Sequence, residues 1–309
     1  MIRMIVVAGE ALIDRIVQPD GSVVDHPGGG PFNTARTIAR LGVPVAFLGA
    51  LSTDPSGTIL RDALASDGVD LSLAVSTAAP TTVAIARIDP HGAATYLFET
   101  EGTSATQLSV DAVRAALATR PAAFHLGTLG LVLEPIATAL ADALGDVATG
   151  TFVMLDPNSR APAIADRGAY LARLLRILRD VDAVKASRDD LDFVWPGMPP
   201  AVAAHRILTA GPSAVIVTDG ARPVSCFTSG WAFALDVPHG PVVDTVGAGD
   251  AFGGTLLARW VERGFGRAEF GDQSAVRDAV ELAIRAASLT CGRAGADPPD
   301  RRELAWPMS

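Results

Sequence analysis

Short apolar runs alternate with longer stretches of helical period along most of the chain. The apolar runs have the length of buried strands, and they occupy residues 4–8, 45–49, 122–126, 152–155, 183–185 and 214–218. The helical stretches occupy residues 32–41, 55–65, 110–118, 133–144, 163–178 and 200–209, and further helices begin near Ala248 and Ala275. This alternation predicts an α/β fold in which helices cover both faces of a mostly parallel central sheet.

Three segments depart from this alternation and predict a second, smaller sheet. Residues 12–24, 72–75 and 82–98 are rich in Val, Ile, Thr and Tyr. Turn signals stand at Asp20-Gly21 and at residues 89–92, where the sequence reads DPHG. These features are typical of hairpins that project from a main sheet, where they would cover a bound ligand as a lid.

We therefore expect residues 1–309 to form a single domain with a lid built from segments near residues 12–25 and 72–100. Residues 222–227 and 231–235 predict a further antiparallel pair ahead of the last helices. The chain contains no internal repeat, low-complexity tract or linker that would favour a division into two domains.

Composition and charge limit the partners that we expect. Hydrophobic residues make up 49% of the chain and charged residues 19%, which is typical of a globular protein. The formal net charge is −9 and no basic run occurs, so we expect neither nucleic acid nor a membrane as a partner. Cys226 and Cys291 lie far apart and lack the spacing of metal ligands, which favours a reducing, cytoplasmic location.

A glycine-rich helix start carries the strongest chemical signal. Residues 244–250 read DTVGAGD and precede an apolar helical stretch. Glycines let a backbone approach an anion, and a helix N-terminus offers free N–H groups to it, so phosphate is the expected guest. Asp250 would then stand in the first helical turn, placed to accept a proton from an attacking hydroxyl, and the motif predicts phosphoryl transfer. An ordinary glycine-rich helix start is the alternative on this motif alone.

Two other nucleotide-binding motifs fail on inspection. A dinucleotide fingerprint counted from Gly247 needs Gly or Ala at its sixth position, where this chain has Phe252. A Walker A loop needs Gly-Lys followed by Ser or Thr, and the one lysine, Lys185, lies elsewhere in the chain.

A second glycine-rich loop occupies residues 28–36, which read GGGPFNTAR. It also opens a helix, and Asn33 in the first turn would present its amide to a polyol. By itself this motif fits a tight turn before a helix equally well.

Together the two motifs resemble those of the pfkB, or ribokinase-like, carbohydrate kinases, whose signatures read GGxxxN and DTxGAGD. Four further segments add to the resemblance: GEALID at residues 9–14, DPNSR at 156–160, VTDGA at 217–221 and RAGA at 293–296. The likeness is greatest to fructokinases. It implies a ribokinase-like three-layer fold and ATP-dependent phosphorylation of a neutral sugar hydroxyl.

The resemblance also implies roles for individual residues. The sugar would be bound by Asp14, Gly29, Asn33, Glu134 and Arg160. Asp250 would be the general base, and the backbone amides of Gly247, Ala248 and Gly249 would form an anion hole for the transferring phosphoryl group. The nucleotide would be contacted by Ser187, Thr218, Gly220 and Gly249.

The implied cofactors are Mg²⁺ and a monovalent cation such as K⁺. The family's Asn-x-x-Glu motif, which organises Mg²⁺ through water, corresponds here to Ser187 and Asp190. The alternative is an ordinary helix start in which Ser187 is the N-cap. Asp244 and Gly295 resemble parts of the K⁺ site of several members, although an Asp before a helix also has a purely structural explanation.

Two differences from related kinases limit which substrates we expect. Gly30 stands where sugar-phosphate kinases often carry a Lys, which disfavours a phosphorylated substrate. Residues 98–103 are acidic where ketodeoxygluconate kinases carry basic residues. Fructose is therefore the first candidate. The alternatives are a ribokinase, a nucleoside kinase, a ketodeoxygluconate kinase, or a regulator that binds sugar or nucleotide without catalysis. We also expect a homodimer formed through the exposed edge of the lid.

Overall fold

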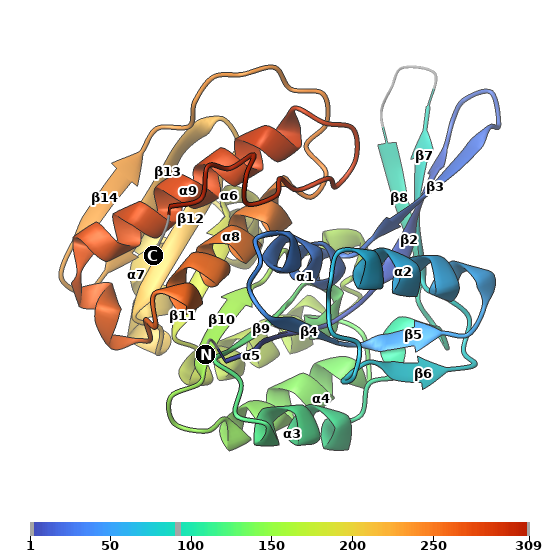
Figure 1. Ribbon diagram of the computed structural model, residues 1–309, viewed down its shortest axis with the longest axis horizontal. Coiled ribbons are helices and arrows are strands. Elements are labelled where there is room, and N and C mark those ends of the chain that lie inside the picture. Colours follow the sequence, from blue (N-terminus) through green and yellow to red (C-terminus); the bar gives the residue numbers. More distant parts are fainter. Residues whose placement is uncertain (1–2, 90–93, 308–309) are drawn as a thin grey trace.

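The predicted apolar runs are strands of one eight-stranded sheet in the computed structural model, which describes residues 3–89 and 94–307 (Figure 1). Its strand order is β14-β13-β12-β11-β10-β9-β1-β4. The parallel strands are β1 (Ile5–Ala8), β4 (Val45–Leu48), β9 (Ala123–Gly127), β10 (Phe152–Asp156), β11 (Ala183–Ser187) and β12 (Ala214–Asp219). At one edge, β13 (Arg222–Thr228) and β14 (Ala232–Leu235) run antiparallel, as predicted.

Helices cover both faces of this sheet, which confirms the three-layer prediction. On one face lie α1 (Gly30–Arg40), α8 (Ala248–Glu262) and α9 (Gln273–Cys291). On the other lie α3 (Val110–Ala118), α4 (Ile136–Ala143), α5 (Arg167–Ile177), α6 (Arg188–Val194) and α7 (Pro200–Ala210). A hydrophobic core lies on each face of the sheet, and alternate side chains of β1 belong to one or the other. Ile5 and Val7 pack with α1 and α8, while Val6 packs toward the opposite layer.

Capping side chains set where several of these helices begin. Asp54 accepts a hydrogen bond from the Gly57 N–H at the start of α2 (Pro55–Ser66), and Ser109 caps α3, so both helices begin at the predicted residues. Three predicted starts are wrong. Helix α1 begins at Gly30 rather than at residue 32. Helix α5 begins at Arg167 rather than at residue 163, because Asp166 is its cap, and α4 begins at Ile136 rather than at residue 133.

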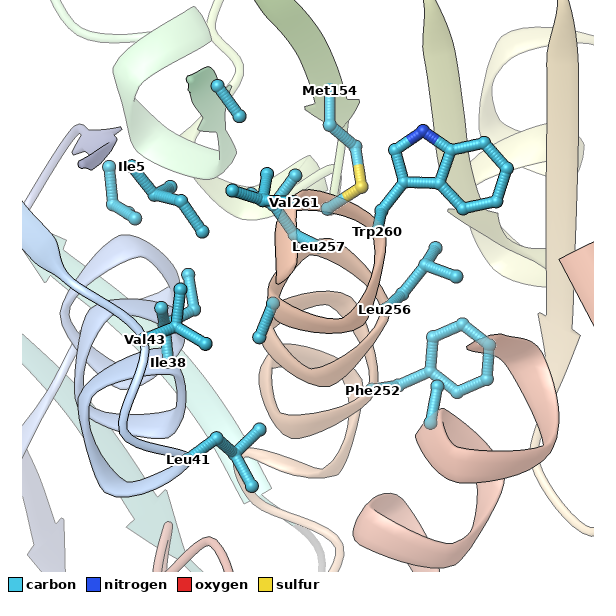
Figure 2. Close-up of a cluster of buried hydrophobic side chains, with 14 of the residues drawn as sticks. Ile5, Ile38, Leu41, Val43, Met154, Phe252, Leu256, Leu257, Trp260 and Val261 are labelled. Carbon is cyan, nitrogen blue, oxygen red and sulfur yellow. The ribbon is translucent and has the colours of Figure 1, made fainter. Parts of the chain in front are cut away.

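Helices α1 and α8 pack side by side at unusually close range. Figure 2 shows Ile38 of α1 on the left, facing the helix α8 that carries Leu257 and Val261. A Cβ atom on Gly254 would lie 2.9 Å from Thr37 Cβ and 3.0 Å from the Thr34 carbonyl oxygen, so only glycine permits this contact. The two helices therefore hold their N-termini at the same end of the molecule.

The smaller sheet projects beyond the helical layers in Figure 1. It has the order β3-β2-β7-β8 and contains β2 (Leu12–Val17), β3 (Val23–Gly28), β7 (Val83–Ile88) and β8 (Ala94–Glu99). Strands β2 and β3 form one antiparallel hairpin and β7 and β8 another, and β2 pairs in parallel with β7. Of the turn predicted at residues 89–92, all but Asp89 lies outside the described residues.

The prediction that residues 72–75 belong to this sheet is wrong. Strand β6 (Val75–Thr77) instead pairs in parallel with β5 (Ala50–Ser52) in a separate two-stranded sheet. The chain leaves β4 through Gly49, whose carbonyl accepts a hydrogen bond from the Val75 N–H, and so offers β6 a free backbone edge beside the main sheet. No helix in the two described stretches is both long and apolar enough to cross a membrane.

Candidate active site

The two glycine-rich motifs meet where the N-termini of α1 and α8 lie together. The Asn33 side-chain amide donates a hydrogen bond to Asp250 Oδ2 at 2.9 Å, and both side chains are buried. A Cβ atom on Gly30 would lie 2.5 Å from Thr128 Oγ1 and 3.3 Å from Asp250 Oδ1. Residues from α1, α8 and the turn after β9 therefore converge on one point at the carboxyl ends of the parallel strands, where ligands of open α/β sheets bind.

The surroundings of Asp250 suit a group that exchanges a proton. Burial raises the pKa of its carboxyl, while the Asn33 hydrogen bond and the charges of Lys185 and Arg160 oppose that rise. The Asn33 bond also fixes one carboxylate oxygen and leaves Oδ1 next to Gly30. Asp250 is thus oriented and partly desolvated, as a general base requires.

The start of α8 leaves two backbone donors without a helical partner, while the Ala248 N–H of the predicted anion hole donates to the Thr245 carbonyl at 3.3 Å. Gly247 is the N-cap, has a left-handed φ of 76° and provides no side chain that could cap the helix. A Cβ atom there would lie 2.5 Å from Ala296 Cβ, so only glycine is accommodated. The N–H groups of Gly249 and Asp250 precede the first helical hydrogen bond, which runs from the Ala251 N–H to the Gly247 carbonyl. Gly249 is exposed, so an anion can approach this end of the helix.

Asp14 and Arg160 belong to the same electrostatic environment. Burial raises the pKa of Asp14 to about 6, Arg160 acts to lower it, and the neighbouring Asp250 charge acts to raise it. The Asp14 carboxylate lies so close to Gly28 that a Cβ atom there would overlap Oδ2. Gly29, the N-cap of α1, has φ 109° and approaches the Glu10 carbonyl. Asp14, Gly29, Asn33, Arg160 and Asp250 are thereby brought together.

Glu10 is a buried carboxyl group beside this cluster. Its side chain is 1% exposed, and burial raises its pKa to about 8 against opposing effects that include the Arg160 charge. Oε2 accepts a hydrogen bond from the Gly130 N–H, and Oε1 has no partner among the described residues. Burial therefore favours the neutral form of this carboxyl group.

Ser187 and Asp190 form a capping box at the start of α6. The Asp190 side chain accepts hydrogen bonds from the Ser187 N–H and from Oγ, and its other oxygen accepts one from the Ser159 N–H. Both Asp190 oxygens thus already accept hydrogen bonds from the protein, which favours the contact through water that the resemblance implies. Asp156 Oδ1 lies near Asp190 and is buried without a partner in the described chain. Such a pair of carboxylates fits Mg²⁺, which keeps several waters and takes few protein ligands.

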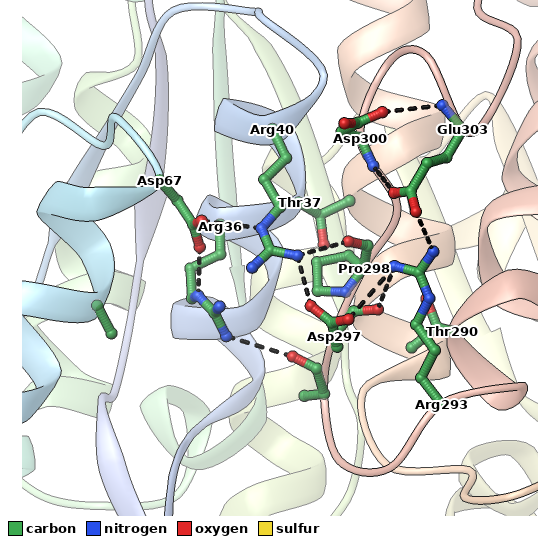
Figure 3. A network of polar contacts seen from close by, with 12 residues as sticks. Arg36, Thr37, Arg40, Asp67, Thr290, Arg293, Asp297, Pro298, Asp300 and Glu303 are labelled. Atoms are coloured by element: carbon green, nitrogen blue, oxygen red, sulfur yellow. Dashed lines mark hydrogen bonds and ion pairs between the residues drawn. The ribbon is translucent and has the colours of Figure 1, made fainter.

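Asp244 joins the turn before α8 to the loop at residues 293–298. Its carboxylate accepts hydrogen bonds from the Val246 and Gly295 N–H groups, at 3.0 and 2.9 Å. Figure 3 shows how α1 holds this loop from the other side. Arg36 donates to the Ala296 carbonyl and Arg40 to Asp297, and both arginines ion-pair with Asp67. The predicted cation site thus has a defined scaffold, while the cation itself stays a prediction.

Glu134 is the predicted site residue that the structure engages elsewhere. Its half-exposed carboxylate ion-pairs with Arg173 of α5 and accepts a hydrogen bond from the Thr138 N–H. We therefore assign it no role in the site. Thr218 is the penultimate residue of β12, Gly220 follows that strand, and Ser187 ends β11, so the predicted nucleotide contacts lie at the same edge as Asp156.

Three residues of the site were not singled out for it from the sequence. Thr128 and Asn158 flank Gly30, and both have a positive φ, of 55° and 39°. Such strained backbone often accompanies function, but sequence alone does not reveal it. The third is Lys185, whose Nζ donates to Asp156 Oδ2 at 2.8 Å. Its signal was present in the sequence, as a unique lysine at the end of a buried strand.

Comparisons with known proteins agree with this geometry. The family described as "pfkB family carbohydrate kinase" matches residues 2–302. A fructokinase of Rhizobium leguminosarum bv. trifolii is 35% identical over 260 residues, which are 82% of this chain and 79% of that protein. A Xylella fastidiosa fructokinase with bound ATP superposes with a TM-score of 0.88 at 26% identity, covering 96% of this chain and 94% of that one. A Vibrio cholerae O395 fructokinase binding fructose, ADP and calcium gives 0.82 at 25% identity, with coverage of 96% and 94%. The chain belongs to the pfkB family of carbohydrate kinases.

Proposed function

We propose that this carbohydrate kinase phosphorylates fructose with ATP, with Asp250 as the general base. The observation that carries the proposal is the hydrogen bond between Asn33 and Asp250, because it joins the loop suited to a polyol to the helix start suited to a phosphate. Fructokinases among the relatives support the choice of sugar.

The residues suggest a direct transfer. Asp250 takes the proton of a sugar hydroxyl, whose oxygen attacks the γ-phosphorus of ATP. The new O–P bond forms as the bond from that phosphorus to the bridging oxygen breaks, and ADP leaves with its electron pair. The amides at the start of α8 stabilise charge on the transferring group. Mg²⁺, when bound, neutralises phosphate charge, and Asp156 and Asp190 are the residues that would hold it, the latter through water.

The remaining side chains orient the sugar and exclude water. Asp14 accepts hydrogen bonds from sugar hydroxyls, Asn33 contributes its free Oδ1, and Arg160 donates from the rim. Strand β8 packs against the 3₁₀ turn Ala161–Ala163 that follows Arg160, so the smaller sheet is placed to close over the sugar. Closure would protect ATP from hydrolysis.

The first experiment measures ADP release by the purified protein with ATP and Mg²⁺. The acceptors are fructose, ribose, ketodeoxygluconate, fructose 6-phosphate and adenosine, each with and without K⁺. We expect the highest kcat/KM with fructose. A higher value with ribose or adenosine would transfer the assignment to a ribokinase or nucleoside kinase. No release with any acceptor, from folded protein that binds ATP, would favour a non-catalytic binding protein.

The KM for fructose should depend on pH because the Asp14 carboxyl titrates. With its pKa at about 6, the carboxylate that accepts sugar hydroxyls is lost as the pH falls through that value. We expect KM for fructose to rise by up to about tenfold per pH unit below 6. In Asp14→Asn, KM should be high and nearly independent of pH between about 5 and 8. An Asp14→Asn variant that keeps the wild-type KM profile would contradict this role.

We also propose a homodimer formed through the smaller sheet. Val23 and Val24 of the edge strand β3 and Leu97 of the opposite edge strand β8 are about half exposed. Unpaired strand edges with apolar side chains seek partners. Light scattering coupled to gel filtration should give a dimer for the wild type and a monomer for Val24→Asp combined with Leu97→Asp. A monomeric wild type at micromolar concentration would refute the proposal.

A further inference from the structure

The chain contains a single lysine, and the fold buries it in the active site. Of the 25 cationic Lys and Arg side chains, Lys185 alone is a lysine. It lies on β11, and its side chain is only 4% exposed. The sequence places it at the end of a strand, far from either glycine motif, and the function proposed above gives it no part.

The Lys185 ammonium lies next to Gly249, in the first turn of α8. A Cβ atom on Gly249 would be 3.1 Å from Nζ, so the absence of a side chain at Gly249 leaves the space above the ammonium open. Among the described residues Nζ has one hydrogen-bond partner, Asp156 Oδ2. An ammonium carries three N–H donors, so donors remain for a further acceptor. A compact ammonium also fits under a glycine more readily than a planar guanidinium does.

The charges around Lys185 keep it protonated. The titratable groups that face it are Asp156, Asp190, Asp250 and His125. Lys185 Nζ lies 2.8 Å from Asp156 Oδ2, and this ion pair holds the side chain as an ammonium. Burial, and then the Lys185 charge, lowers the pKa of His125 to about 3, so this imidazole is neutral. A full positive charge therefore stands next to Gly249.

A buried ion pair of this kind contributes little to the stability of a protein. Apolar residues of similar volume usually stabilise a protein at least as well, because they avoid the desolvation of two charges. The Lys185 and Asp156 side chains are 4% and 5% exposed, yet the pair stands at the carboxyl edge of the sheet where the ligands converge. Its position points to a function in the reaction.

We propose that Lys185 is a further catalytic residue, whose ammonium contacts the transferring phosphoryl group where the Gly249 amide receives it. The inference rests on the function proposed above. The amides of α8 provide partial charges, and Lys185 adds a full charge that is fixed before the substrates arrive and costs no reorganisation during transfer. Glycine at position 249 is required because a side chain would separate the ammonium from the phosphoryl group.

Because the lysine is unique, its side chain can be observed directly. Protein made with ¹⁵N,¹³C-lysine and no lysine in its tag has one side-chain ammonium signal. We expect this signal to shift on addition of the β,γ-imido analogue of ATP with Mg²⁺, and to stay in place with AMP, which brings no γ-phosphate. Calorimetry confirms that each nucleotide is bound. An unmoved signal in protein saturated with the triphosphate analogue would refute the contact.

A kinetic comparison separates the effect of the Lys185 charge on kcat from its structural pairing with Asp156. Lys185→Met alone would leave Asp156 buried and unpaired, so Lys185→Met is combined with Asp156→Asn and compared with Asp156→Asn alone. We expect the double variant to have a kcat about 10²-fold lower than the single variant, with the same KM for fructose and a similar Tm. Equal kcat values would reduce Lys185 to a structural partner of Asp156.

The two proposals fail in different ways. If the wild type phosphorylates none of the acceptors but the lysine signal shifts with the triphosphate analogue, the sugar assignment is wrong and the phosphate contact stands. If fructose is phosphorylated and the lysine signal does not move, the kinase assignment stands and Lys185 is excluded from it.

Discussion

Asp250→Asn should lower kcat by about 10²- to 10⁴-fold and leave fructose binding nearly intact. The amide has almost the shape of the carboxylate and still accepts the hydrogen bond that Asn33 donates at 2.9 Å, so the geometry at the start of α8 is kept. It cannot take the proton of the sugar hydroxyl. Steady-state kinetics and calorimetry with fructose measure the two effects separately.

The matched control for this variant is Asp62→Asn, on the exposed side of α2. It makes the same chemical change away from the site and should keep the wild-type kcat. An Asp250→Asn enzyme with near-normal turnover would remove Asp250 as the base and leave positioning and charge stabilisation as the source of catalysis.

Glu10→Gln should make the protein more stable at alkaline pH. Burial raises the pKa of Glu10 from 4.5 to about 8, so the folded state binds this proton more tightly than the unfolded state does. The free energy of unfolding of the wild type therefore falls as the pH rises from 4.5 through about 8. The substituted amide carries no titratable proton, and the advantage of the variant should grow across the same window to at most about 5 kcal/mol.

Urea unfolding at pH values between about 6 and 9 tests this expectation. The Gln side chain can still accept the hydrogen bond from the Gly130 N–H, so the contact seen at Oε2 is preserved. Glu281→Gln, at an exposed position on α9, is the control and should follow the wild-type curve. Parallel curves for Glu10→Gln and the wild type would show that Glu10 is ionised in the folded protein.

The central sheet was predictable because strands buried on both faces are apolar at most positions. Residues 5–8 and 214–217 contain no polar side chain that would suggest an alternative. The short strands β5 and β6 could not be found in this way, since three residues each carry no period. Their pairing depends on where the main chain leaves β4, which is a property of the assembled fold.

The site was predictable where it consists of contiguous motifs. The two glycine loops pointed to a sugar and a phosphate, and the Asn33–Asp250 bond joins them across 217 positions. Lys185 was given no role from the sequence, because it does not stand in a Walker A loop. In the fold, β11 places this lysine beside the neighbouring strand β10 and so brings it to the site. Glu134 matched a sequence pattern, yet an arginine 39 positions away holds its carboxylate.

The contact between α1 and α8 at Gly254 tolerates fewer amino-acid substitutions than the exposed hairpin of the smaller sheet. Asp250 and its amide partner Asn33 stand on two helices that pack without room for a methyl group, so variation there is heavily constrained. Asp14 stands instead on β2, in a hairpin that is exposed on most of its second strand. Substitutions in this hairpin can therefore alter the proposed contact of Asp14 with the acceptor without disturbing the packing of α1 against α8. Hairpins exchanged between relatives should therefore carry acceptor preference with them.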